Sequence, residues 1–142
     1  MEVRIHIDGG ARGNPGPAGA GVVIETTDDG TVLFAGGFYL GRATNNVAEY
    51  TGLIRGLERA AALGATAAAV RSDSELLVRQ MNGKYRVRNA GLRPLFEQAC
   101  ELRGRFDQFD IAHVYREDNT DADRLVNQAI DARRNVEDAD QT

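Results

Sequence analysis

The chain has 142 residues, of which 42% are hydrophobic and 27% charged, as expected for one globular domain with a substantial core. Its formal net charge of -4 argues against a general nucleic-acid binder, so such a role would need local basic patches or bound cations. The single cysteine, Cys100, excludes an intramolecular disulfide and is expected to be a buried structural thiol. There is no apolar run of membrane-spanning length and no signal-peptide core, so we expect a cytoplasmic protein.

The first β-strand is predicted over residues 3–8, where apolar and polar residues alternate. It is expected to end at Asp8, which Gly9 and Gly10 follow. These glycines leave the backbone without side chains, and residues 13–17 (Gly-Asn-Pro-Gly-Pro) are typical of a turn. A bulky charged ligand could approach the backbone here, although an ordinary hairpin with a solvent-facing carboxylate explains the same residues.

The hydrophobic period then distinguishes further strands from helices along the chain. The predicted elements are strands at 19–25 and 31–40, a helix between Thr44 and Gly64, a strand at 67–72, a helix between Ser74 and Asn82, a helix at 95–106, a strand at 109–115 and a helix from Thr120 to about Ile130. A hairpin turn at residues 28–30 joins the second and third strands, so the first three strands are expected to be antiparallel.

Three antiparallel strands followed by alternating strands and helices predict an α/β fold with a single mixed sheet and helices on both faces. Residues 1–134 are expected to form one domain. Residues 135–142 are acidic and have no capping signal, so we expect a disordered tail there.

Four carboxylates occupy positions that a fold of this kind would bring together. Asp8 and Asp73 follow predicted strands, and they would lie side by side if those strands are parallel neighbours. Glu49 lies in the first turns of the first long helix and Asp123 in the first turn of the last one. Each acid alone has an ordinary structural explanation at a helix N-terminus, but four such placements together predict a site.

Clustered carboxylates repel one another unless a cation joins them. Oxygen ligands without a set of cysteines favour Mg²⁺, or Mn²⁺ as a substitute, over zinc. The only histidines, His6 and His113, are expected to be strand residues rather than ligands. Two such ions about 3.5 to 4 Å apart can clamp an in-line phosphoryl displacement, so the acids predict metal-dependent phosphodiester chemistry.

Four motifs in register over most of the chain resemble type 1 ribonuclease H. They are Asp8-Gly9-Gly10 with Gly13-Asn14-Pro15-Gly16-Pro17, Thr44-Asn45-Asn46-Val47-Ala48-Glu49-Tyr50, Ser72-Asp73-Ser74, and Asn119-Thr120-Asp121-Ala122-Asp123-Arg124-Leu125. The resemblance implies a five-stranded ribonuclease H-like sheet and two-metal hydrolysis of the RNA strand of RNA-DNA hybrids, leaving 5'-phosphate and 3'-hydroxyl ends. It maps the family's catalytic and metal-binding acids onto Asp8, Glu49, Asp73 and Asp123, and it suggests a monomer with no obligate protein partner.

The same resemblance, with the basic residues of the chain, gives a set of expected contacts to the hybrid's backbone and sugars. The expected substrate-binding residues are Gly9, Gly10, Arg12, Asn14, Thr44, Asn45, Asn46, Ser74, Lys84, Arg86, Arg88 and Arg116. Asparagine side chains and bare backbone amides suit a duplex that is read through its minor groove and 2'-hydroxyls. For the cluster around Lys84, a solvated basic loop is an equally good explanation.

Three departures from the family pattern limit this transfer. Residues 115–119 lack the mobile histidine of relatives with a longer loop, and Arg116 or Glu117 is the candidate substitute. Glu75 stands where a glutamine that touches nucleic acid is common. The long basic protrusion of some relatives is missing, which predicts weaker and more salt-sensitive hybrid binding.

Two other classes of function remain open from the sequence. The same fold could serve as a catalytically silent hybrid-binding module, or as another metal-dependent nuclease. A silent module would be expected to lack one of the four acids, and all four are present.

Overall fold

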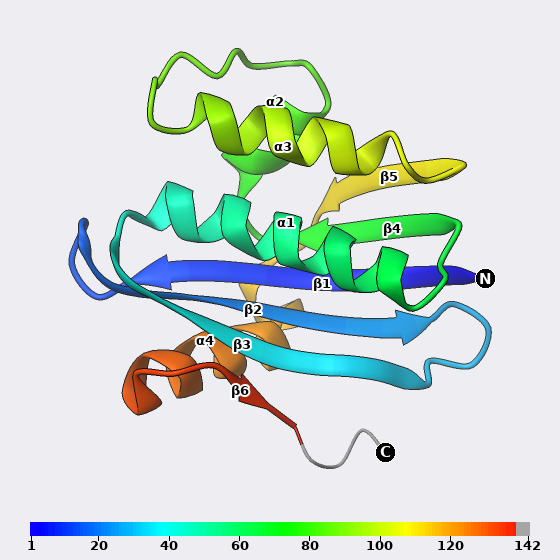
Figure 1. Ribbon diagram of the computed structural model, residues 1–142, viewed down its shortest axis with the longest axis horizontal. Helices are drawn as coiled ribbons and strands as arrows, with labels where there is room; N and C mark the ends of the chain where they lie inside the picture. The colour runs from blue at the N-terminus through cyan, green and yellow to red at the C-terminus, as the bar shows by residue number, and fades with distance from the viewer. Residues whose placement is uncertain (139–142) are drawn as a thin grey trace.

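The computed structural model describes residues 1–138 of the protein (Figure 1). Its elements follow in the order β1 (Glu2–Ala11), β2 (Gly16–Thr26), β3 (Val32–Ala43), α1 (Asn45–Ala62), β4 (Ala67–Ser72), α2 (Glu75–Met81), α3 (Arg93–Arg103), β5 (Gln108–His113), a 3₁₀ turn (Arg116–Asp118), α4 (Thr120–Ala132) and β6 (Val136–Glu137). None of the helices within residues 1–138 combines the length and apolar character needed to cross a membrane.

The strands form one mixed sheet in the order β5-β4-β1-β2-β3-β6. β1 pairs antiparallel with β2 and β2 antiparallel with β3, whereas β4 runs parallel to both β1 and β5. The predicted α/β class and the three antiparallel opening strands are therefore confirmed. β1 lies at the centre of the sheet, with its parallel neighbour on one side and its antiparallel neighbour on the other.

The sheet has six strands rather than the five expected. Val136 pairs with Gly37 and Glu137 with Gly36, which makes β6 the edge strand beyond β3. The side chain of Asn135 accepts a hydrogen bond of 2.9 Å from the backbone N–H of Tyr39. The prediction of a disordered tail was wrong for this part, because two residues are too few for a periodic signal. The rest of the predicted tail, residues 139–142, lies outside the described residues.

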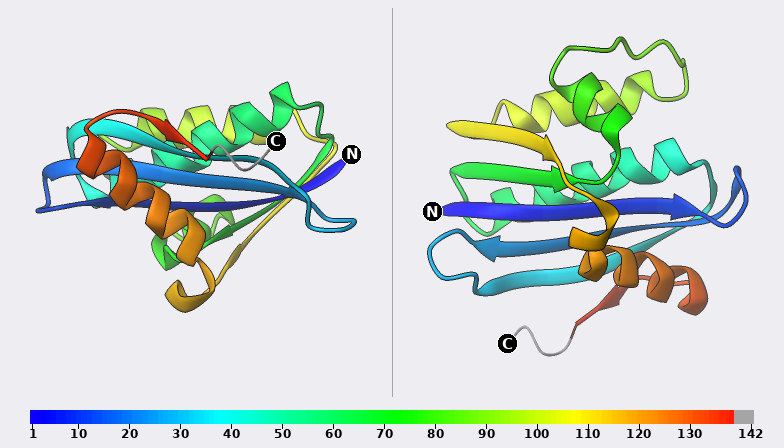
Figure 2. Two further views of the ribbon diagram at one scale, coloured as in Figure 1. Left: turned by 90° about the horizontal axis from the view of Figure 1, so that it is seen from below. Right: turned by 180° about the vertical axis from the view of Figure 1, so that it is seen from behind.

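Helices cover both faces of the sheet, as predicted. α1 packs on one face, with α2 and α3 on the same side, and α4 crosses the opposite face (Figure 2). Ile5, Ile7, Leu53 and Leu57 are fully buried in the core between β1 and α1. This two-sided arrangement allows residues of both α1 and α4 to reach the end of β1.

Helix starts were predicted more accurately than element ends. The Thr44 hydroxyl accepts a hydrogen bond from Val47 N–H at 3.2 Å, and the Ser74 hydroxyl accepts one from Leu77 N–H at 3.2 Å, so both predicted N-caps are confirmed. α3 ends three residues before Phe106, which is buried beyond the helix. Cys100 lies on α3 and is half-buried rather than buried.

Candidate active site

Asp8 and Asp73 are brought together by the parallel pairing of β1 with β4. The pairing ends at Ile7 opposite Ser72, so the next residue of each strand is one of the two acids. This confirms the predicted juxtaposition. However, Asp8 does not end its strand, because β1 continues to Ala11 along β2. Asp8 therefore lies at the point of β1 where the pairing with β4 ends while the pairing with β2 continues.

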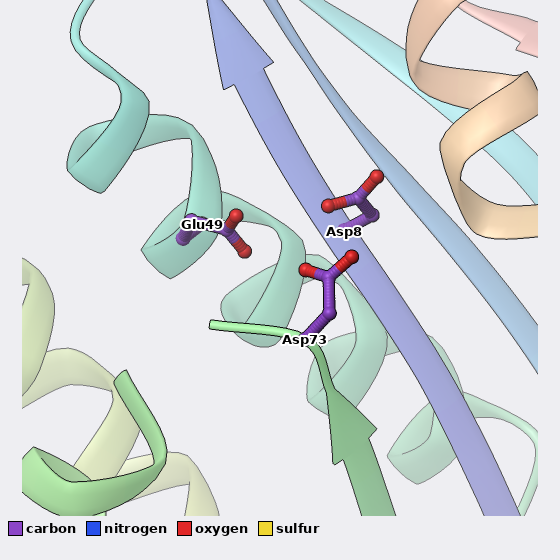
Figure 3. A group of neighbouring side chains, drawn as sticks. All are labelled: Asp8, Glu49 and Asp73. Carbon is purple, nitrogen blue, oxygen red and sulfur yellow. The ribbon is translucent and has the colours of Figure 1, made fainter. Parts of the chain in front are cut away.

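Glu49 completes a compact group of three carboxylates. One oxygen from each of Asp8, Glu49 and Asp73 lies within 4.8 Å of the other two. Figure 3 shows the three side chains pointing toward one another from β1, from α1 and from the segment after β4. The Thr44 cap fixes where α1 begins and therefore where Glu49 stands relative to the strands.

Gly9 allows α1 to lie directly against β1 beside these acids. A Cβ atom at Gly9 would stand 2.3 Å from the carbonyl carbon of Ala48 and 2.4 Å from the backbone nitrogen of Glu49. The expected open backbone at this position is therefore covered by α1. At Gly10 the nearest atom to such a Cβ is Val126 Cγ1 at 3.9 Å, which is ordinary contact.

Asp123 approaches the group from the other face of the sheet. It lines a hollow of about 380 Å³ together with Asp8, Glu49 and Arg116, but it stands outside the compact group of three. The Asn119 side chain, which is buried, donates a hydrogen bond of 2.8 Å to the backbone oxygen of Ile7. Asn119 thereby holds the start of α4 next to Asp8, a role that its place in a motif did not reveal.

The crowding of buried acids changes their proton affinity. The pKa of Asp8 is raised from 3.8 to about 8, mainly by burial and then by the negative charges of Asp73 and Asp123, while the backbone N–H of Gly9, 2.9 Å from Oδ1, opposes the shift. Burial, followed by the charges of Asp8 and Asp73, also raises the pKa of Glu49 well above its ordinary value, while Arg116 opposes this shift. Without a cation, the site therefore favours the protonated forms of Asp8 and Glu49 near neutral pH.

The donor set suits a hard divalent cation. Glu49 Oε2 and Asp73 Oδ2 are buried, and each has no hydrogen-bond partner among residues 1–138. A buried carboxylate oxygen without a partner is costly, and a cation that binds several carboxylate oxygens removes that cost. The residues present therefore fit Mg²⁺ or Mn²⁺.

Known proteins resemble this chain in sequence and fold. The family described as reverse transcriptase-like matches residues 6–129. RNase H1 from the halophilic archaeon Halobacterium salinarum is 42% identical over 93% of this chain and 99% of its own, with a TM-score of 0.89. The chain belongs to the ribonuclease H family.

Two further ribonuclease H structures resemble the chain closely. LC11-RNase H1, solved in complex with an RNA/DNA hybrid, is 46% identical over 92% of this chain and 98% of its own, with a TM-score of 0.87. The N-terminal RNase H domain of Rv2228c from Mycobacterium tuberculosis is 52% identical over 93% of this chain and 95% of its own, with a TM-score of 0.90. The full-length bifunctional protein Rv2228c is 53% identical to this chain over an aligned stretch of 132 residues. The chain spans only 36% of the length of that relative.

Several of the residues expected to bind substrate in this ribonuclease H make internal contacts near the acids. Ala11 N–H donates to Asn45 Oδ1 at 2.8 Å, and Asn45 N–H donates to Asn14 Oδ1 at 3.0 Å, which joins the β1–β2 turn to the start of α1. The Arg12 guanidinium donates to Asp131 of α4 at 2.6 Å. These contacts hold the rim of the acid hollow in place.

Other residues of the expected set do not line the acid hollow. The hydroxyls of Thr44 and Ser74 serve as helix caps, and Asn46 is exposed at the start of α1. Arg86 and Arg88 line a second hollow beside α3, and Lys84 precedes them on the same exposed segment. The expected substrate-binding residues therefore fall into two groups, one at the acid hollow and one on a separate basic surface.

Both histidines are strand residues, as predicted. His6 lies in β1 with its Nε2 2.9 Å from Glu25 Oε1. His113 ends β5 and packs edge-on against Tyr115, with ring centroids 5.7 Å apart.

Proposed function

We propose that the protein is an endonuclease that hydrolyses the RNA strand of RNA-DNA hybrids and leaves 5'-phosphate and 3'-hydroxyl ends. The observation that carries this proposal is the group of three carboxylates within 4.8 Å, two of which have buried oxygens without partners, in a member of the ribonuclease H family. The hybrid bound to LC11-RNase H1 supports the choice of substrate. The proposed setting is the cytoplasm and the proposed active form is a monomer.

In this proposal, Asp8, Glu49, Asp73 and Asp123 hold two Mg²⁺ ions, with Mn²⁺ as a substitute. When bound, such a pair of ions supplies activation of the attacking water and stabilisation of the leaving oxygen. The chain positions the acids: the Gly9 N–H orients Asp8 Oδ1, and Asn119 fixes α4 and so Asp123. The rim residues Gly10, Arg12, Asn14 and Asn45 would face the hybrid's backbone and sugars beside the acids.

The proposal is tested by incubating the protein with an RNA-DNA hybrid and, for comparison, with single-stranded RNA, double-stranded RNA and double-stranded DNA of the same sequence. We expect cleavage of the hybrid's RNA strand alone, only with Mg²⁺ or Mn²⁺, and none in EDTA. Equal cleavage of single-stranded RNA, or full activity in EDTA, would refute it. Tight hybrid binding without cleavage under any metal would instead indicate a silent binding module.

Arg116 is the better of the two candidates for the place of the family's mobile histidine. Both residues are exposed, but Arg116 lines the acid hollow and its charge opposes the raised pKa of Glu49, whereas Glu117 does not line that hollow. A cation at this position can stabilise charge that develops on the phosphate. We therefore propose that Arg116 contacts the substrate during hydrolysis.

Arg116→Ala is expected to lower kcat about 10-fold or more, because the active site loses a cation that can stabilise the charge on the phosphate. The melting temperature should stay unchanged, because the Arg116 side chain is exposed. Arg116→Lys should recover part of the rate, and Glu117→Ala is the matched control on the same turn. Steady-state kinetics with the hybrid measure the effect. A larger loss of kcat in Glu117→Ala than in Arg116→Ala would contradict this proposal and assign the role to Glu117.

A further inference from the structure

A third hollow, of about 120 Å³, lies where the start of α4 meets the face of the sheet opposite α1 (Figure 2). We call it the strand–helix hollow. Its lining comes from β1, β2, β3 and the residues around the first turn of α4, namely His6, Val23, Glu25, Val32, Asp118, Asn119, Thr120, Asp121 and Ala122. None of these residues lines the acid hollow, so the two hollows are separate.

Asn119 brings a buried acceptor without a partner to the strand–helix hollow. The residue is 2% exposed, and its Nδ2 is occupied by the hydrogen bond to the Ile7 oxygen. Its Oδ1, at the other end of the amide, is buried and has no hydrogen-bond partner among residues 1–138. Because Asn119 lines this hollow and not the acid hollow, a donor held in the strand–helix hollow can satisfy Oδ1.

The lining of the hollow is rich in negative acceptors. Glu25, Asp118 and Asp121 are carboxylates, and no lysine or arginine among residues 1–138 lines the hollow. Glu25 Oε1 lies 3.3 Å from Arg4 Nη1 and 2.9 Å from His6 Nε2, whereas Oε2 has no hydrogen-bond partner in the described chain. The hollow therefore offers free oxygens to a cationic donor.

Two positive groups near the hollow do not cancel this charge. The N-terminus of α4 is the positive end of a helix dipole, but Asp121 and Asp123 in its first turn already complement it. The Arg4 side chain is 41% exposed and contacts only Oε1 of Glu25.

The donor set and the size of the hollow suit an ammonium group better than a bare metal ion. Within residues 1–138, the only three ligand side chains close enough to share an ion are the acids of the active site. An ammonium group instead carries three N–H donors and no acceptor. The apolar side chains of Val23, Val32 and Ala122 suit methylene groups, and a cavity of about 150 Å³ can hold a molecule as large as benzene.

We propose that the strand–helix hollow binds a primary alkylammonium group, with its nitrogen against Asn119 Oδ1 and Glu25 and its chain along the valines. The group then joins β2 to the residue before α4, and α4 carries Asp123. The binding itself is independent of the proposed nuclease activity, and only this link to Asp123 rests on it. The ammonium group belongs either to a free alkyl polyamine or to a lysine side chain of a partner protein.

The test uses the full chain with ¹³C-labelled valine methyls and ¹⁵N-labelled side-chain amides, in excess Mg²⁺ so that amines do not compete for the acid hollow. NMR follows the additions of n-butylamine and of tetramethylammonium, which has the same charge and no N–H. We expect butylamine alone to shift the signals of Val23, Val32 and Asn119, with a Kd on the order of 1 mM. The signals of Val126, which lines the acid hollow, should stay unchanged. No shift with butylamine, or equal shifts with tetramethylammonium, would overturn the proposal.

Variants of the lining provide the second measurement. Glu25→Gln should weaken butylamine binding about 5- to 10-fold, because a charge-assisted hydrogen bond becomes a neutral one. The double variant Asp118→Asn/Asp121→Asn changes only exposed side chains, so it keeps the test valid if Glu25→Gln fails to fold, and it should weaken binding about 3- to 5-fold. Asp107→Asn removes an exposed charge outside the lining and should have no effect. Unchanged affinity in the double variant and in Glu25→Gln would contradict the proposal.

Two further probes distinguish the sources of the ammonium group. Tighter binding of 1,4-diaminobutane than of Nα-acetyl-lysine amide would indicate a free polyamine, and the reverse order would indicate a lysine side chain. Failure of the protein to cleave hybrids, with the Val23 and Val32 signals still shifting, would contradict the proposed activity alone.

Discussion

Asp8→Asn is expected to lower hybrid cleavage by about 10³-fold while making the metal-free protein more stable than the wild type above about pH 4, with the full gain reached near pH 8. Asp8 is 6% exposed and lies beside Asp73 and Asp123, so its ionised form is unfavourable in the folded state without a cation. The amide keeps the shape of the side chain and removes the repulsion. Activity and stability are therefore expected to change in opposite directions.

The pH dependence of this effect follows from the raised pKa. The unfolded chain loses the Asp8 proton near the ordinary value of 3.8, whereas the folded chain keeps it up to about pH 8. Between these values the folded state binds more protons, so the contribution of Asp8 to the free energy of unfolding falls as pH rises. Each unit of the shift corresponds to about 1.4 kcal/mol, and about 1 kcal/mol changes the melting temperature by roughly 4 °C in a chain of this size.

Thermal unfolding of wild type and Asp8→Asn in EDTA, from about pH 4 to pH 9, measures the difference. The variant's advantage should be absent at the acid end and grow toward the alkaline end, to at least about 5 °C. Mg²⁺ should raise the melting temperature of the wild type more than that of the variant. Asp107→Asn, an exposed carboxylate away from the hollow, is the control. A variant that is less stable at every pH would show that Asp8 is a structural residue.

Gly9→Ala is expected to destabilise the protein by about 3 kcal/mol or more, because its Cβ would stand 2.3 Å from the Ala48 backbone. α1 would have to move away from β1, and Glu49 would move with it. Gly10→Ala is the matched control, since its Cβ would meet only Val126 at 3.9 Å. Urea unfolding measures stability, and calorimetric titration with Mg²⁺ measures the site. If Gly9→Ala unfolds like the wild type and loses only hybrid affinity, Gly9 serves ligand approach and not helix packing.

The spacing of hydrophobic residues along the sequence was enough to predict the α/β fold class and the order of the strands and helices. It also placed Asp8 and Asp73 correctly, because parallel neighbours bring equivalent positions to the same edge. The ends of the elements were less predictable. β1 continues past Asp8 because β2 still pairs with it there. The alternation of apolar and polar residues does not reveal that only one of the two neighbouring strands continues.

Contacts between distant segments were also invisible in the sequence. The open backbone expected at Gly9 is occupied by α1, and the same residue pattern is compatible with both outcomes. The hydrogen bond between Tyr50 and Gln80 joins α1 to α2, and neither residue stands out in its own helix. The short β6 strand depends on the free edge of β3, which only the assembled sheet provides.

The four acids come from β1, α1, the end of β4 and α4, and the last of these elements lies on the opposite face of the sheet from α1. During synthesis on the ribosome, the first three acids emerge long before Asp123. A nascent chain that has not yet docked α4 therefore lacks its fourth acid and has the Ile7 carbonyl without its Asn119 donor. The proposed nuclease activity is thus withheld from growing chains and begins only when α4 has been released and folded.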